Sequence, residues 1–217
     1  MALDAQGVFF SYPKTKRQIL QNIDISFHTG EIAAIIGANG SGKTTLTKLL
    51  VGILRPSMGS ISVENNALNT MSIAEIGRYI GYVFQNPSQQ IFCTSVEEEI
   101  LYGLKNLDLP KIEIEDRVNK YLDYFQLSSY KHKFPLHLSQ GEKQRLMLAS
   151  ILAMQPQYII LDEPTTGLDV YRRKLLGDYL LKMKADGCGI IFVSHEKRFI
   201  QRYADRVILL KDGMIAK

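Results

Sequence analysis

The chain has 217 residues, which at roughly 150 residues per domain indicates one large domain or one domain with a subdomain. Hydrophobic residues make up 46% and charged residues 22%, and these ordinary proportions exclude wholesale disorder and collagen-like structure. A formal net charge of +4 is too small to indicate nucleic-acid binding by itself. Cys93 and Cys188 lie far apart without a CxxC motif, so neither a zinc site nor a disulfide framework is predicted. The longest apolar runs are much shorter than the about twenty residues of a membrane-spanning helix, so we expect no membrane crossing.

Strand-like and helical segments alternate in the first part of the chain. β-branched and aromatic residues predict strands over 8–12, 23–27, 32–36, 60–63 and 79–84. Helices are predicted over 43–54 and 72–77. The fully apolar run at 32–36 is typical of a parallel sheet covered on both faces, whereas the N-terminal strands are typical of an antiparallel flank.

The strand signal disappears between about residues 95 and 154. Ser95 and Glu98 have the spacing of a capping box in front of a helix over 96–104, and an acid-rich amphipathic stretch predicts another helix over 113–125. The alternation then resumes. It predicts strands over 158–161 and 190–193, helices over 171–185 and 196–203, and a hairpin of 206–210 with 214–216 across Asp212 and Gly213.

These elements predict an α/β fold with a mostly parallel central sheet, an antiparallel β flank and an inserted helical subdomain. We expect a single domain over 1–217. Its core is expected at about 1–85 and 155–217, and the helical subdomain at about 86–154.

Residues 37–44, GANGSGKT, match the pattern GxxxxGK[ST] between an apolar strand and a helix, which is the context that this motif requires. Glycines let successive backbone N–H groups curl around a phosphate, and Lys43 and Thr44 can serve the phosphates and Mg²⁺. The alternative is a glycine-rich turn with an ordinary surface lysine, which the strand–loop–helix context disfavours. We therefore predict a P-loop NTPase core. Its expected nucleotide-binding residues are Gly37, Asn39, Gly40, Ser41, Gly42, Lys43, Thr44 and Thr45.

A second apolar strand, at 158–161, ends in Asp162 and Glu163. Ligands of an open parallel sheet bind beyond the carboxyl ends of its strands, so these acids are expected beside the phosphate loop. There Asp162 can hold Mg²⁺ through water, and Glu163 can deprotonate an attacking water. Pro164 is expected to keep Glu163 extended. The alternative is a solvated strand end that carries acids for solubility.

Residues 138–145, LSQGEKQR, precede this strand by about twenty residues and resemble the signature sequence of ATP-binding-cassette (ABC) ATPases. The resemblance covers nearly the whole chain, with the motifs in the expected order. It implies that Tyr12 stacks on adenine, that Gln85 is the Q-loop glutamine, that residues 166–169 form the D-loop and that His195 is the switch histidine.

Each of these residues has a structural alternative. Ser139 with Glu142 is also a capping box, which explains both residues without a ligand. Tyr12 could be an ordinary strand aromatic, Gln85 an ordinary loop residue and His195 a structural histidine. Two positions depart from the family pattern, because Gln140 replaces the first glycine of the signature and Glu142 replaces its glutamine.

The resemblance implies a subunit that binds ATP and Mg²⁺ and hydrolyses ATP. Lys43, Gln85, Glu163 and His195 are its expected catalytic residues, and Thr44, Gln85 and Asp162 its expected metal ligands. Ser139 and Gly141 are expected to act on the ATP held by a second ATPase subunit, which is either another copy of this chain or a close relative.

A cassette without a membrane segment implies a separate transmembrane subunit and a place at the cytoplasmic face of the cell membrane. Residues 83–100 resemble energy-coupling-factor ATPases and their cobalt and nickel relatives, which implies uptake of a vitamin or a metal ion, with docking through residues 87–92 and 96–104. The alternatives are the ATPase of an exporter and a soluble mechanical ATPase that acts on DNA or ribosomes, although no nucleic-acid partner is expected. A P-loop kinase would not need the signature or His195. The chain ends soon after the last hairpin, as expected of a truncated or minimal version of such ATPases.

Overall fold

The computed structural model describes residues 2–13 and 17–216 of the chain. These residues form two β-sheets and seven α-helices, with short 3₁₀ turns between them. The strands are β1 (Ala2–Phe10), β2 (Leu20–His28), β3 (Ile32–Ile36), β4 (Met58–Val63), β5 (Asn66–Ala67), β6 (Ile80–Val83), β7 (Tyr158–Asp162), β8 (Gly189–Val193), β9 (Arg206–Lys211) and β10 (Met214–Ile215). The helices are α1 (Lys43–Leu50), α2 (Ile73–Tyr79), α3 (Val96–Leu104), α4 (Lys111–Tyr124), α5 (Gln140–Ala153), α6 (Val170–Ala185) and α7 (Lys197–Tyr203).

The central sheet has the strand order β10-β9-β3-β8-β7-β6, in which only the short β10 pairs antiparallel among the described residues. The predicted hairpin of β9 and β10 is confirmed, with Met214 paired to Lys211 across the turn. Asp212 and Gly213 both have positive φ in that turn, as a tight two-residue hairpin requires. The expected α/β fold with a mostly parallel central sheet and an antiparallel flank is confirmed.

The middle strands β3, β7 and β8 consist almost entirely of apolar residues, because both faces of the sheet are buried. Each face packs against a different hydrophobic cluster. In β8, Ile190 and Phe192 join the cluster under α5 and α6, whereas Ile191 and Val193 join the cluster under α1 and the antiparallel strands. Side chains alternate between the faces of a strand, so burial on both faces requires apolar residues at every position. All five residues of β8 are buried.

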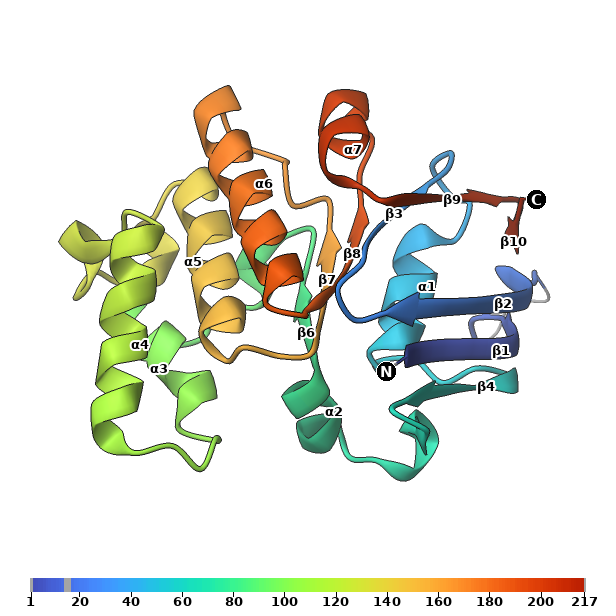
Figure 1. The fold of residues 1–217 in the computed structure, drawn as a ribbon, viewed down its shortest axis with the longest axis horizontal. Helices are drawn as coiled ribbons and strands as arrows, with labels where there is room; N and C mark the ends of the chain where they lie inside the picture. The colour runs from blue at the N-terminus through green and yellow to red at the C-terminus, as the bar shows by residue number, and fades with distance from the viewer. Residues whose placement is uncertain (1, 14–16, 217) are drawn as a thin grey trace.

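The second sheet is antiparallel and has the order β2-β1-β4-β5. It lies at one end of the molecule, while α3, α4 and α5 lie at the opposite end, beyond β6 (Figure 1). β1 begins six residues earlier than predicted, at Ala2. The sequence pattern missed this part because the pairing with β2 shifts register between Ala5 and Val8, and Gly7 in between has φ +56°.

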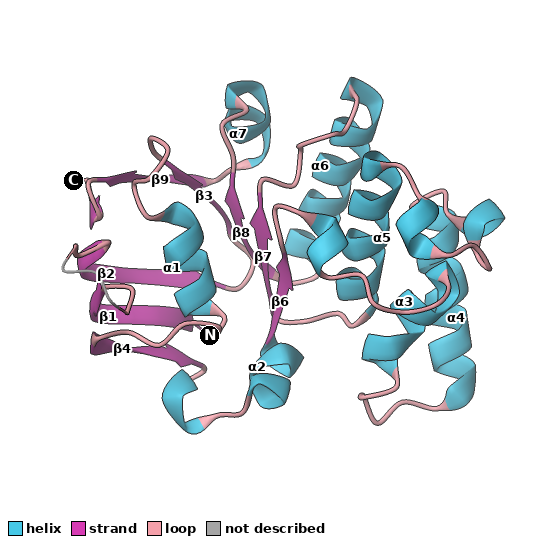
Figure 2. Ribbon diagram, turned by 180° about the vertical axis from the view of Figure 1, so that it is seen from behind, coloured by secondary structure: helices cyan, strands magenta, loops and turns pink. Residues whose placement is uncertain are grey.

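Seen from behind, α1 lies close to the antiparallel strands while α5 and α6 cover the other end of the central sheet (Figure 2). The prediction of a helix over 43–54 is wrong at its end, because α1 stops at Leu50. Gly52 follows the C-cap residue Val51 and has φ +72°, the left-handed backbone with which helices commonly end, so the chain turns instead of continuing. The predicted strand over 79–84 is likewise shorter, since Tyr79 belongs to α2.

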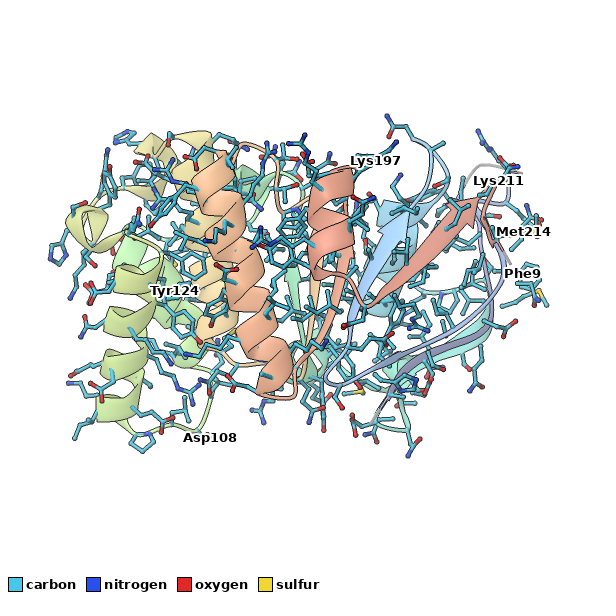
Figure 3. The ribbon with its side chains drawn as sticks, turned by 45° about the horizontal axis from the view of Figure 1, so that its top comes forward. Phe9, Asp108, Tyr124, Lys197, Lys211 and Met214 are labelled. Carbon is cyan, nitrogen blue, oxygen red and sulfur yellow. The ribbon has the colours of Figure 1, made fainter. Side chains whose placement is uncertain are left out.

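Helices α3, α4 and α5 pack together around aromatic and aliphatic side chains. Tyr124 of α4, labelled in Figure 3, packs against Tyr179 of α6, with ring centroids 4.7 Å apart. Ser95 caps α3 as expected, because its hydroxyl accepts a hydrogen bond from the N–H of Glu98. The Glu98 carboxylate accepts hydrogen bonds from the Thr94 hydroxyl and from Ser95 in return. The boundaries of a helical subdomain at 86 and 154 stay a prediction.

Candidate functional site

A cleft of about 780 Å³ opens at the carboxyl ends of β3, β7 and β8. It brings together residues that the sequence analysis selected from five separate segments. The predicted residues that line it are Tyr12, Asn39, Gly40, Gly42, Lys43, Thr44, Thr45, Gln85, Asp162, Glu163 and His195. Thr166, the first residue of the expected D-loop, lines it as well. Arg17, Ile19 and Val193 also line it, and they were not among the expected site residues. The other predicted residues, Gly37, Ser41, Ser139 and Gly141, are not part of its described lining.

The loop between β3 and α1 has a backbone that only glycine tolerates at two points. A Cβ on Gly37 would lie 2.2 Å from the carbonyl oxygen of Leu210, and Gly42 has φ +106°. Gly42 is the N-cap of α1 and offers no side-chain hydrogen bond to the helix. The first N–H groups of α1 therefore have no side-chain cap, and their partial positive charge faces the cleft as an anion site.

Lys43 is buried at the base of this loop. Its Nζ donates hydrogen bonds of 2.9 Å to the carbonyl oxygens of Gly37 and Ala38. These contacts hold a compact positive charge beside the helix N-terminus. A phosphate bound in the cleft would compete with the two carbonyls for the same ammonium protons. Ser41 Oγ is buried nearby without a hydrogen-bond partner among the described residues, which leaves a donor for such a ligand.

Asp162 and Thr44 form an oxygen-rich pair that fits a magnesium ion. The Thr44 hydroxyl donates to the Asp162 carboxylate, while burial raises the pKa of Asp162. Mg²⁺ prefers hard oxygen ligands and keeps several waters, so one hydroxyl and one carboxylate are a suitable donor set. Gln85 lines the same cleft and can add an amide oxygen. The structure thus supports these three side chains as candidates to hold Mg²⁺.

Two hydroxyls that the sequence analysis missed lie behind Asp162. Tyr82 of β6 donates to the Asp162 carboxylate and lies 3.1 Å from Thr47 Oγ1. Thr47 is fully buried and donates to the Thr44 carbonyl oxygen at 3.0 Å. Both residues look like ordinary core positions in the sequence, and only the packing of β6 against α1 brings them under the acid.

Glu163 and His195 meet at the mouth of the cleft. His195 Nε2 lies 3.3 Å from Glu163 Oε1, with the histidine half exposed and the carboxylate largely buried. Burial raises the pKa of Glu163, and the nearby His195 partly offsets this effect. A carboxylate with a raised pKa is a stronger base, so the pair has the chemistry to accept a proton from water.

The expectation that Pro164 keeps Glu163 extended is wrong. Glu163 has φ +52°, in the left-handed region, which is uncommon for a residue with a Cβ. Its N–H donates to the Val193 carbonyl oxygen at 3.0 Å, across from the neighbouring strand β8. The sheet contact therefore overrides the local preference imposed by the proline, and it turns the side chain toward His195.

Tyr12 stands at the rim of the cleft. Its hydroxyl lies 3.2 Å from Thr45 Oγ1, and its ring meets Phe10 edge-on with centroids 4.9 Å apart. The side chain is 38% exposed, so part of the ring can receive a flat ligand. Its contact with Thr45 fixes the ring relative to the first turn of α1.

Ser139 and Gly141 lie outside this cleft, at the N-terminus of α5. Ser139 Oγ accepts from Glu142 N–H, and the Glu142 carboxylate accepts from both the N–H and the hydroxyl of Ser139, each at 2.7 Å. The predicted capping box is therefore confirmed. These hydrogen bonds, with another from Tyr130, lower the pKa of Glu142 to about 2.

Comparison with known proteins places this arrangement in a family. The ABC transporter family profile matches residues 20–166, and the chain belongs to this family of ATP-binding and ATP-hydrolysing proteins. A putative ABC transporter ATP-binding protein of Pyrococcus horikoshii is 42% identical over 97% of this chain and 80% of its own length. The energy-coupling factor transporter ATP-binding protein EcfA of Methanocaldococcus jannaschii is 37% identical over 99% of this chain and 77% of its own length.

A solved structure gives the same result. The chain superposes with a TM-score of 0.85 and 34% identity on cbiO1 from Clostridium perfringens, described as part of the ABC transporter complex cbiONQ, over 99% of this chain and 86% of that one. Among the described residues, no helix is both long and apolar enough to cross a membrane. The cleft is therefore the candidate ATP site of an ABC transporter ATP-binding subunit.

Proposed function

We propose that this chain powers the uptake of a small solute, a vitamin or a metal ion, as an ATPase subunit of the energy-coupling-factor type. The meeting of Lys43, Asp162, Glu163 and His195 in one cleft carries the assignment of ATP hydrolysis to these side chains. The identity of 37% with EcfA supports the energy-coupling-factor subfamily.

In this proposal the phosphates lie on the N–H groups of α1 and on Lys43, and Tyr12 stacks on adenine. Thr44, Gln85 and Asp162 would hold Mg²⁺, which would neutralise phosphate charge when bound. Glu163 accepts a proton from the attacking water, whose oxygen bonds to the γ-phosphorus while the bond to the bridging oxygen of ADP breaks.

His195 would contact the γ-phosphate from the side of β8. Ser139 and Gly141 would bind the γ-phosphate of ATP held by a second subunit, so that two ATP molecules lie between two head-to-tail cassettes. The position of these two residues outside the chain's own cleft supports a role toward a partner. ATP then favours the closed pair because its γ-phosphate receives donors from both subunits, and hydrolysis removes that contact.

The substitution Glu163→Gln tests this mechanism. It removes the base and keeps the shape of the side chain, so we expect turnover to fall roughly 10²–10⁴-fold while ATP still binds. The closed pair should then accumulate with ATP, which size-exclusion chromatography with light scattering would detect. Turnover at the wild-type rate would exclude Glu163 as the base.

A groove of about 540 Å³ supports docking of a separate membrane subunit at the cytoplasmic face of the membrane. It lies between α2, α3 and α5, and Phe92 and Tyr102 on its edge are 63% and 54% exposed, with ring centroids 4.7 Å apart. Glu99 holds this edge, because its carboxylate accepts from the N–H groups of Phe92 and Cys93 at 3.1 and 2.9 Å. Exposed aromatic rings beside an apolar groove are typical of a protein-binding surface.

Replacing both rings, Phe92→Ser with Tyr102→Ser, tests the docking surface. We expect the membrane subunit to be lost from affinity purification, since its apolar contact is removed, while ATP binding by the isolated chain stays unchanged. Ile112→Ser, at an exposed position of α4 away from the groove, is the matched control. Undiminished co-purification of the double variant would place the contact elsewhere.

A further inference from the structure

Arg173, in the first turn of α6, joins two loops of the site and has no role in the function proposed above. Its Nε donates to the carbonyl oxygen of Leu168 at 2.9 Å, and one terminal nitrogen donates to Glu196 Oε2 at 3.0 Å. The Arg173 and Glu196 side chains are 38% and 34% exposed. The contact is thus accessible at the surface but fixed by two directional bonds.

The first of these loops begins at Glu163. The N–H of Thr166 donates to the Glu163 carbonyl oxygen at 3.1 Å, and the N–H of Leu168 donates to the Thr165 carbonyl oxygen at 3.2 Å. Leu168 itself is buried. The guanidinium of Arg173 therefore binds the end of a turn that starts at the candidate base.

The second loop carries His195. Glu196 follows it directly and precedes α7, which starts at Lys197 (Figure 3). The N–H of Glu196 donates to Ser194 Oγ at 3.1 Å. Glu196 is the N-cap residue of α7 but makes no side-chain cap bond to it, because its carboxylate binds Arg173 instead. This choice leaves α7 uncapped and ties the loop of His195 to α6.

These contacts connect Glu163 and His195 in two ways. Directly, His195 Nε2 lies 3.3 Å from Glu163 Oε1. Indirectly, Arg173 joins Leu168, at the end of the turn that begins at Glu163, to Glu196, the residue after His195. His195 is exposed and sits in a connecting loop, so a fixed neighbour on one side restricts where its ring can lie. Small displacements of a reacting group can cost up to about a hundredfold in rate.

We propose that Arg173 is a positioning residue that holds His195 against Glu163 by tying Glu196 to the Leu168 turn. The inference rests on the roles proposed above for Glu163 and His195. It requires a guanidinium, since the planar fork donates to a carbonyl and a carboxylate at once in fixed directions, whereas a lysine ammonium is a single point charge.

ATP turnover and affinity of the full chain test this inference. Arg173→Gln removes the guanidinium, and Glu196→Gln removes the negative charge that it binds, so each weakens the same link. We expect either to lower kcat roughly tenfold and to leave the KM for ATP and the affinity for a fluorescent ATP analogue within about twofold. The double variant should match the single ones, because the second change removes nothing further. Arg173→Lys should not restore kcat.

Lys174→Gln removes a neighbouring charge from an exposed position of α6 and is the matched control, with wild-type kcat expected. Glu196→Gln changes the other partner of the same contact, just before α7 and outside α6. It therefore keeps the test valid if Arg173→Gln unfolds α6. Wild-type kcat in both single variants, or losses that multiply in the double variant, would overturn the inference. Rescue by Arg173→Lys would also overturn it.

Glu163→Gln and His195→Ala are measured in the same assay. If they retain turnover, the roles proposed for these two residues fail, and the inference fails with them. If they abolish turnover while Arg173→Gln and Glu196→Gln behave as wild type, only the role of Arg173 fails.

Discussion

The N-termini of α1 and α5 are two helix ends with opposite chemistry. Gly42 begins α1 without a side-chain cap, and no acid lies in its first turn. Ser139 begins α5 with a complete capping box, and Glu142 puts a carboxylate in its first turn. One helix end is left open to an anion, whereas the other satisfies its own N–H groups and carries a negative charge.

This difference suggests separate roles for the two helix ends in ATP binding and in ATP turnover. The open end at α1 lies beside Lys43 in one chain, so it can take phosphates without a partner. At α5 the Ser139 hydroxyl is engaged by Glu142, at 2.7 Å, and a phosphate must compete for it. We therefore expect α1 to determine ATP affinity and α5 to act only when a second subunit brings a γ-phosphate to it.

The largest effects on ATP affinity and turnover are expected from single substitutions at the N-termini of α1 and α5. Lys43→Met removes the buried ammonium beside the phosphates, so ATP affinity should fall at least about tenfold, as measured by calorimetry. Ser139→Ala should leave the affinity of the isolated chain unchanged and still abolish turnover, because in the proposed pair its hydroxyl contacts the ATP of the partner.

Mixing these two variants sharpens the comparison. A pair with one copy of each contains one site with both Lys43 and Ser139 intact, so turnover should partly return if two copies of this chain form the closed pair. Normal turnover in Ser139→Ala would contradict the assignment of ATP affinity to α1 and of turnover to α5. Lys143→Met, on the first turn of α5, is the control for loss of a lysine and should keep ATP affinity.

A smaller effect is expected when alanine replaces the glycine of each end. A Cβ on Gly42 would lie 2.7 Å from Leu20 Cδ2, in a backbone with φ +106°, so Gly42→Ala should lower the free energy of unfolding by roughly 1–3 kcal/mol. A Cβ on Gly141 would lie 3.1 Å from the Gly167 carbonyl oxygen, in helical backbone, so Gly141→Ala should change it by less than about 1 kcal/mol. Urea unfolding measures both, and equal losses would mean that the phosphate loop makes no special backbone demand.

The smallest effect concerns acid stability. The pKa of Glu142 is lowered in the folded chain to about 2 by hydrogen bonds from Ser139, so the ionised form stabilises the fold above the ordinary pKa of 4.5. This contribution should be lost as the pH falls from about 4.5 toward about 2. In Glu142→Gln the loss of stability over this range should be smaller, as measured by urea unfolding at several pH values.

Glu115→Gln on α4 is the control for Glu142→Gln, since Glu115 makes an exposed ion pair with Lys111 at 3.8 Å. An unchanged acid profile in Glu142→Gln would mean that the capping box does not contribute to the stability of α5.

Many elements could be predicted from the sequence because local physics decides them. The apolar strands β3, β7 and β8, the hairpin at Asp212 and Gly213, and the capping box at Ser139 all follow from periodicity or short-range hydrogen bonding. Errors arose where a distant segment decided the outcome. The left-handed backbone of Glu163, for example, goes with a hydrogen bond to Val193 of another strand. The end of α1 was instead a local signal that the prediction missed, since Gly52 just after the helix has φ +72°.

The sequence by itself determined the phosphate loop, the acidic strand end and the order of the motifs, because each is a run of neighbouring residues with fixed chemistry. Only the tertiary structure decided that Tyr82 and Thr47 lie under Asp162, and that Arg173 reaches Glu196. Such contacts join residues far apart in the chain, and the packing of the sheet against its helices sets the distances between them.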